Sequence, residues 1–94
     1  MINFNAKTSE ELEIEMEERS EEICVSICQS VCDALDINAD KVIIGFITNF
    51  GTELVANSEG FLFCLEENLT RLENAEAYEL CDRVKKWIEK LKTK

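Results

Sequence analysis

The 94-residue sequence contains no histidine, no proline and only three glycines. Without histidine it lacks the side chain that most often acts as a general acid or base and as a metal ligand. Basic residues are also scarce, because acidic residues outnumber them 20 to 10 and give a formal net charge of −10. A surface that binds duplex nucleic acid needs clustered Lys and Arg to contact phosphates, so this deficit argues against such a surface.

Enzyme motifs are absent as well. The sequence has no G-x-G-x-x-G, P-loop, H-E-x-x-H or G-x-S-x-G pattern. A cysteine nucleophile would have no histidine as its base. Asp33, Asp36 and Asp40 do not follow the twelve-residue calcium loop, which needs Gly at its sixth position and Glu at its twelfth. The sequence therefore predicts a protein that is not an enzyme and that needs no cofactor or metal.

No apolar stretch has the length of a membrane span, and the N-terminus lacks the apolar run of a signal peptide. We therefore expect one domain over residues 1–94, located in the cytoplasm. The five cysteines would be thiols in that reducing compartment. Cys24, Cys28 and Cys32 recur every fourth residue, so they share one helical face. We interpret them as packing residues, with a metal or redox role as the alternative.

An acidic N-terminal helix is predicted over residues 8–35. Thr8 followed by Glu11 is typical of a capping box. The apolar stripe of this helix consists of Leu12, Met16, Ile23, Ile27 and Val31. On a straight helix, Glu13 and Glu17 would lie on the same side as Val31 and Leu35, which are expected to be buried. We therefore expect the helix to project beyond the core or to bend near Ser20.

Three strands are predicted over residues 42–48, 52–56 and 61–65. The first is a continuous, β-branched apolar run, which predicts burial on both faces. Turns are expected at residues 49–51 and 57–60, the second with Gly60 at a positive φ. Connections this short predict an antiparallel meander.

The predicted fold class is therefore α+β, in the order α-β-β-β-α, with a three-stranded antiparallel meander flanked by two helices. The second helix is expected from about Leu69, with a break at residues 74–77, and it ends in a basic segment over residues 83–94. Residues 2–6 alternate apolar and polar, which predicts an additional short strand or an ordered arm.

Charge is concentrated at both ends of the chain. Residues 1–40 carry a net charge of −9 and residues 83–94 a net charge of +5. Residues 10–22 hold eight glutamates, and Arg19 is the only basic residue among them. Acids favour a helix N-terminus by about 0.3–1 kcal/mol each, but only within the first turn. Like charges four residues apart repel by a few tenths of a kcal/mol per pair, so the run as a whole opposes helix stability.

Three explanations of the acidic run remain open. It is a solvated face, it pairs with the basic end of this chain or of a second subunit, or it docks on a basic partner. Carboxylates fixed on a helix can imitate the charges of a phosphate backbone. The candidate partner-binding residues are Glu10, Glu11, Glu13, Glu15, Glu17, Glu18, Glu21 and Glu22. Glu11, Glu15, Glu18 and Glu22 are expected to lie opposite the apolar stripe, so reversing their charge should leave the core intact.

One segment, Gly45-Phe46-Ile47-Thr48-Asn49-Phe50-Gly51-Thr52-Glu53-Leu54-Val55-Ala56, resembles the first hairpin of roadblock-type and related profilin-like domains. The resemblance covers these residues alone, because the sequence after Leu65 lacks the remaining strands. In size, acidity and order of elements the chain is also similar, in general character, to small secretion chaperones, toxin-immunity proteins and phage inhibitors of nucleic-acid-binding defence enzymes.

The leading functional hypothesis is a small acidic cytosolic protein that binds another protein and inhibits it by occupying a basic, nucleic-acid-handling surface. The type of inhibitor expected is that of phage or mobile-element anti-defence proteins. The alternative is an acidic homodimeric adaptor or chaperone that binds through its apolar sheet and second helix. A homodimer is predicted because two helices on one face of the sheet would leave the other apolar face for a second subunit.

Overall fold

The structure of the protein is a computed structural model that describes residues 2–93. It confirms an α+β fold, in which four helices accompany a three-stranded mixed sheet within the described residues. The elements in chain order are β1 (Ile2–Phe4), α1 (Ser9–Glu18), α2 (Ser20–Asp36), β2 (Lys41–Ile47), the short 3-10 turn η1 (Thr48–Phe50), β3 (Thr52–Asn57), α3 (Ser58–Asn74) and α4 (Tyr78–Lys92). None of these helices is both long and apolar enough to cross a membrane.

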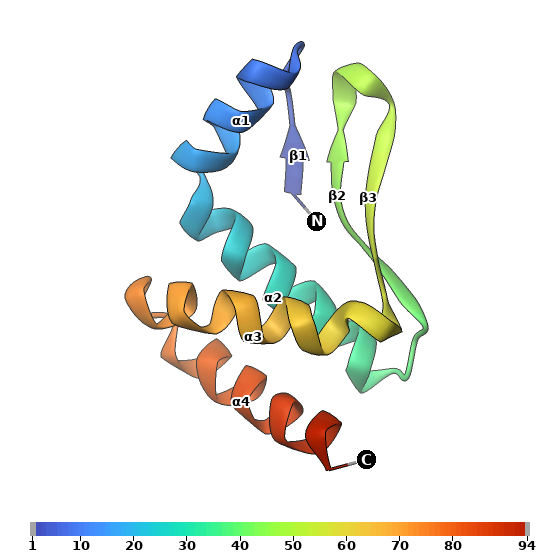
Figure 1. Ribbon diagram of the computed structural model, residues 1–94, viewed down its shortest axis with the longest axis vertical. Coiled ribbons are helices and arrows are strands. Elements are labelled where there is room, and N and C mark those ends of the chain that lie inside the picture. Colours follow the sequence, from blue (N-terminus) through green and yellow to red (C-terminus); the bar gives the residue numbers. More distant parts are fainter. Residues whose placement is uncertain (1, 94) are drawn as a thin grey trace.

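The sheet has the order β1-β2-β3, so the predicted antiparallel meander is only partly right (Figure 1). β2 and β3 form the predicted antiparallel hairpin, whereas β1 pairs parallel to β2. The alternating N-terminal residues thus form the strand that their pattern predicts. Gly45 allows this pairing, because a Cβ at that position would lie only 3.2 Å from the backbone oxygen of Ile2.

The predicted third strand, residues 61–65, is wrong. These residues form the first half of α3, a helix of 17 residues that starts directly after β3. Four of its residues are buried at helical spacing, namely Phe61, Leu65, Asn68 and Leu72. A five-residue apolar run fits a strand and a buried helix equally well, and here the helical continuation past Leu65 decides the outcome. The predicted turn at residues 57–60 is wrong for the same reason, since Gly60 lies inside the helix without a positive φ.

The predicted second helix accordingly starts eleven residues earlier than expected, and the expected break near residues 74–77 separates α3 from α4. In Figure 1 α3 crosses over α2, and α4 runs below both. The larger core lies among these three helices and one end of the sheet, and Cys28, Val31, Leu65 and Val84 are fully buried in it. A smaller core gathers around Ile2, Phe4 and Ile47.

The outer face of the sheet is open within residues 2–93. Ile43 of β2 is 41% exposed, and its partner Val55 on β3 is 46% exposed. The prediction that residues 42–48 are buried on both faces is therefore wrong for a single chain. The helices leave Ile43 and Val55 exposed.

Candidate protein-binding surface

The acidic N-terminal helix is broken at Arg19 into α1 and α2, close to the expected bend at Ser20. Thr8 caps α1, because its hydroxyl accepts a hydrogen bond from the backbone N–H of Glu11 at 3.1 Å. The carboxylate of Glu11 in turn accepts from the backbone N–H of Lys7 at 2.8 Å. This reciprocal pair is the predicted capping box, with one difference. Glu11 accepts from the backbone N–H of Lys7 instead of that of Thr8, the N-cap residue.

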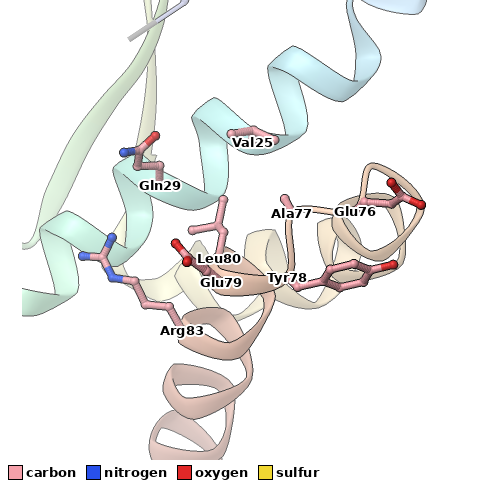
Figure 2. Close-up of a pocket in the computed structure, with 8 residues that line it drawn as sticks. All are labelled: Val25, Gln29, Glu76, Ala77, Tyr78, Glu79, Leu80 and Arg83. Carbon is pink, nitrogen blue, oxygen red and sulfur yellow. The ribbon is translucent and has the colours of Figure 1, made fainter.

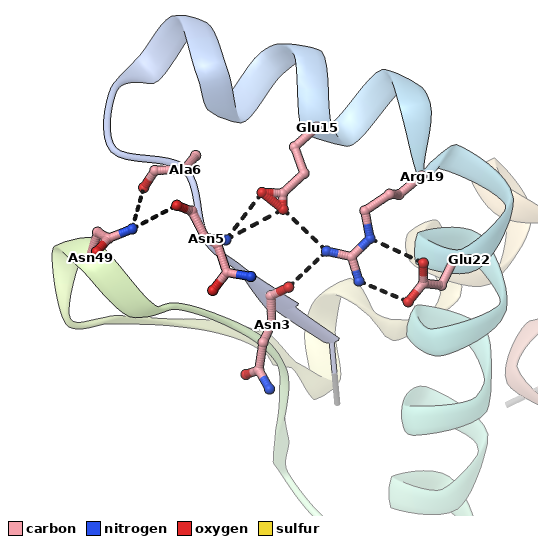
Figure 3. Close-up of polar contacts among 7 residues, drawn as sticks. All are labelled: Asn3, Asn5, Ala6, Glu15, Arg19, Glu22 and Asn49. Atoms are coloured by element: carbon pink, nitrogen blue, oxygen red, sulfur yellow. Dashed lines mark hydrogen bonds and ion pairs between the residues drawn. The ribbon is translucent and has the colours of Figure 1, made fainter.

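Arg19 holds the break together (Figure 3). Its guanidinium donates two hydrogen bonds to the Glu22 carboxylate, at 3.0 and 2.7 Å, and a third to Glu15 at 3.1 Å. A fourth reaches the backbone oxygen of Asn3 in β1 at 2.8 Å, and the cation lies 5.6 Å from the centre of the Phe4 ring. The hydrogen bond from Arg19 lowers the pKa of Glu22 below its ordinary value. One cation therefore ties α1, α2 and β1 together.

The same corner is fastened to the β2–β3 hairpin. Glu15 accepts a hydrogen bond from the backbone N–H of Asn5 at 3.1 Å. The side-chain amide of Asn49, in the hairpin turn, donates to the backbone oxygen of Asn5 at 2.6 Å (Figure 3). These contacts place the start of α1 at a fixed position against the sheet.

The eight predicted partner-binding glutamates thus divide into two groups. Glu11, Glu15 and Glu22 hold the local structure together through the hydrogen bonds described above. The other five are exposed and make no hydrogen bond or ion pair within residues 2–93, and we call them the acidic ridge: Glu10, Glu13, Glu17, Glu18 and Glu21. Reversing the charge of Glu15 or Glu22 would therefore break these hydrogen bonds, and the expectation that the core stays intact on such a reversal stays a prediction.

The basic C-terminal end does not neutralise the ridge. Arg83 binds Asp33 and Asp36 of α2, and the indole N–H of Trp87 donates to Asp36 at 3.2 Å. Lys92 pairs with Glu66 of α3 at 3.1 Å. Among the described residues, the ion pairs of the basic end all go to residues outside the acidic run, so pairing within one chain does not explain the run.

The three cysteines of α2 lie in the core, as the packing interpretation predicts. Cys24, Cys28 and Cys32 are each at most 1% exposed. The Cys24 thiol donates to the backbone oxygen of Asn68 at 3.2 Å. Burial raises the pKa of Cys32 to about 11, and it raises the pKa of Cys28 further. The part of the chain that the structure describes contains no group of three His, Cys, Asp or Glu residues arranged to hold a metal ion.

A hollow of about 490 Å³ lies between α2 and the start of α4 (Figure 2). Figure 2 shows Glu76 and Tyr78 at one end, and Gln29 and Arg83 at the other. Arg83 already binds two aspartates, and Tyr78 is 62% exposed. Arg83 is therefore paired, and Glu76 and Tyr78 lie at the opposite end from Gln29 and Arg83, so the polar groups do not converge on one position as a small-molecule site requires.

Comparison of the chain with protein-family models, with curated proteins and with solved structures finds no match.

In the sequence, Arg19 stands out only as the one basic residue within the acidic run, and this does not reveal its structural role. The signal was nonetheless present, because Arg19 follows Glu15 by four residues and precedes Glu22 by three. Both spacings bring side chains together on a helix surface. Its contacts with β1 depend on the tertiary fold and have no signal in the local sequence.

Proposed function

We propose that this chain is a small, non-enzymatic, cytosolic protein that binds another protein through its acidic ridge. The partner presents a basic surface that handles nucleic acid, and the ridge occupies that surface and inhibits the partner. The observation that carries the proposal is that five glutamates stay exposed and unpaired over two consecutive helices within residues 2–93, although six bases lie in the same chain at residues 83–94.

The geometry of the corner supports this proposal. A charged surface contributes most to recognition when its groups are already in place before binding, since ordering them on contact costs free energy. Arg19, Glu15 and Asn49 fix α1 against β1 and the hairpin turn. The ridge carboxylates are therefore presented from a fixed backbone, as an imitation of a phosphate backbone requires. Such a surface also speeds association with a basic partner.

The test compares two variants of equal net charge. The ridge variant carries Glu10→Lys, Glu13→Lys and Glu21→Lys, and the control variant carries Glu79→Lys, Asp82→Lys and Glu89→Lys in α4. Each changes the formal net charge from −10 to −4, and the six side chains are all exposed. Proteins retained from a nuclease-treated lysate of the native host on the immobilised chain are identified by mass spectrometry.

We expect a partner that the unchanged protein and the control variant retain, and that the ridge variant loses. The unchanged complex should dissociate as salt is raised, because exposed charge pairs are screened beyond about 10 Å at 0.1 M salt. A folded ridge variant that retains every partner of the unchanged protein would leave the ridge with a solubilising role only.

A homodimeric adaptor is the second candidate function, and the open outer face of the sheet favours it. Ile43 and Val55 form an exposed cross-strand pair on this face. An assembly through such a face would change little with ionic strength, in contrast to binding through the ridge. Light scattering distinguishes a monomer from a homodimer. For a homodimeric adaptor we expect twice the chain mass of 10.8 kDa at all salt concentrations.

A further inference from the structure

An apolar groove lies between the sheet and the arm formed by α1 and the first half of α2. It has a volume of about 340 Å³, and its lining includes Phe4, Met16, Ile23, Ile27, Ile44 and Leu54. Glu53 is the only charged residue among those that line this part of the groove. A lining this apolar resembles the core of an interface more than the open surface of a protein.

The groove continues at both ends. Toward the end of α3, Met16, Ile23 and Ile27 also line a hollow of about 400 Å³ that reaches Asn68 and Arg71. Toward the start of α3, Ile44 and Val55 also line a hollow that reaches Phe63 and Cys64. The shared residues place the three hollows next to one another, and we refer to them together as the depression.

One side of α3 forms a wall of the two end hollows. Gly60 and Cys64 line one of them, and Asn68 and Arg71 line the other. Their spacings of three and four residues place them along one face of the helix. The eleven steps of about 1.5 Å from Gly60 to Arg71 give the wall a length of about 16 Å, or three helical turns. The depression therefore has the shape of a trough alongside a helix, and a second helix packs naturally in such a trough.

The charges around the trough indicate a basic occupant. Glu53 lies on the sheet side, and Glu17 on the α1 side belongs both to the trough and to the acidic ridge. Arg71 is the only basic residue among those that line the three hollows. The basic helix of this chain itself, α4, is not free to occupy the trough of a second copy, because its apolar residues Cys81 and Val84 are buried in the core.

We propose that the trough binds an amphipathic basic helix of the partner protein, with its apolar side against Met16, Ile27 and Leu54 and its Lys and Arg residues toward the acidic ridge. The proposal rests on the proposed function and names the structural form of the segment that is recognised. Apolar residues spaced i, i+3, i+4 and i+7 are the standard anchors of such a helix in a groove.

The probe for the test is a fluorescently labelled peptide of about 18 residues, with Leu at helix-patterned positions and Lys elsewhere, which spans the wall of about 16 Å. Its control is a scrambled peptide of identical composition that has no apolar side. Two protein variants form a matched pair, Met16→Lys in the trough and Ile14→Lys, 55% exposed, on the other side of the same helix. Binding is followed by fluorescence anisotropy, and reaction of Cys64 with a maleimide reports occupancy of the trough in the unchanged protein.

We expect the patterned peptide to bind about tenfold more tightly than the scrambled peptide, a difference of about 1.4 kcal/mol. Met16→Lys should weaken its binding about tenfold, Ile14→Lys should weaken it less than about threefold, and the patterned peptide should slow the reaction of Cys64. Equal affinity of the two peptides, equal effects of the two substitutions, or unchanged Cys64 reactivity would each overturn the trough proposal.

The outcomes also separate the two proposals. Equal binding of both peptides that the ridge variant abolishes would overturn the trough and leave the proposed function standing. Binding that the ridge variant does not weaken would contradict the proposed function instead. A chain that sediments as a dimer, protects Cys64 and binds neither peptide would show that a second copy fills the trough, and this too overturns the proposal.

Discussion

Arg19 contributes to the structure through partners in three separate elements. It satisfies Glu15 and Glu22, which would otherwise repel each other across the break, and it binds the backbone of Asn3 in β1. Its side chain is 28% exposed, so these contacts are partly shielded from water. Shielded hydrogen bonds to charged groups contribute more than surface ion pairs, whose median worth is roughly 0–1 kcal/mol.

Replacing Arg19 by Ala should lower the free energy of unfolding by about 1–2 kcal/mol, because Glu15 loses its cation and the Asn3 carbonyl loses its donor. Arg19→Lys keeps the charge and loses the two-pronged contact with Glu22, so its effect should be intermediate. Urea denaturation measures the free energy of unfolding of both variants. The control is Arg71→Ala, at an exposed residue without an ion pair in the described chain, which should change stability by no more than about 0.5 kcal/mol. Equal losses for Arg19→Ala and Arg71→Ala would contradict the role of Arg19.

The buried thiols predict a loss of stability in alkali. Burial raises the pKa of Cys32 from its ordinary 9.0 to about 11, and the pKa values of Cys24 and Cys28 are raised in the same direction. The unfolded chain ionises its thiols first, so their contribution is complete below about pH 9 and is lost as pH rises toward 11. Unfolding measured across that range should show the decline.

Replacing all three of these cysteines by Ala should flatten the alkaline decline and lower stability at neutral pH by about 1 kcal/mol per residue through lost packing. Partner binding should not change, since Cys24, Cys28 and Cys32 lie in the core and not on the ridge. Loss of binding in a folded triple variant, or one metal ion per chain in the purified protein, would restore the metal or redox hypothesis.

The helices and the hairpin follow from sequence patterns wherever one pattern dominates. The capping residues at Thr8, the β-branched run over residues 42–47 and the turn at Gly51 were all predictable. Gly51 has φ 62°, which few other residues adopt without strain. Residues 61–65 were not predictable from their own pattern, because Phe61 and Leu65 match a helix while the five consecutive apolar residues match a buried strand.

The site was predictable only in part. The sequence shows the glutamates, but their division into five free and three bound depends on where Asn3, Asn5 and Arg19 meet in the fold. The apolar trough had no separate signal. Met16, Ile23 and Ile27 belong to the predicted apolar stripe, and nothing in the sequence shows that α3 covers only part of it.

Glycine substitutions test the placement of α3 directly. Gly60 lies in the first turn of α3, without a positive φ, and a Cβ there would meet no atom within 4 Å. Gly60→Ala should therefore stabilise the protein by about 0.5–1 kcal/mol, because Ala favours the helix and restricts the unfolded chain. If residues 57–60 formed a turn with Gly60 at positive φ, Gly60→Ala would instead destabilise the protein.

The matched control is Gly51→Ala, which should destabilise the protein because Gly51 occupies the left-handed region. Thermal denaturation of both variants shows whether each substitution raises or lowers the melting temperature. A Gly60→Ala variant that melts below the unchanged protein would contradict a helix that begins at Ser58.

The uneven distribution of charge along the chain remains after folding. The basic end binds α2 and α3, and the ridge stays exposed at the far end of the helical arm. Figure 1 shows α1 at the opposite end of the molecule from the end of α4. The result is a body with extents of 41 × 28 × 16 Å that carries its negative pole on α1 and the first turn of α2. Such a pole steers encounter with a basic surface at a rate that salt controls.

Binding of the ridge to a nucleic-acid-handling surface is tested by competition with nucleic acid on the captured partner. The partner is loaded with a fluorescent duplex that fills its normal site, and this protein is added at about 0.1 M salt while the complexes are resolved by native mass spectrometry. We expect mutually exclusive complexes, with the duplex displaced by the unchanged protein and by the α4 control variant but not by the ridge variant. A ternary complex in which the partner holds both the duplex and this protein would contradict the claim.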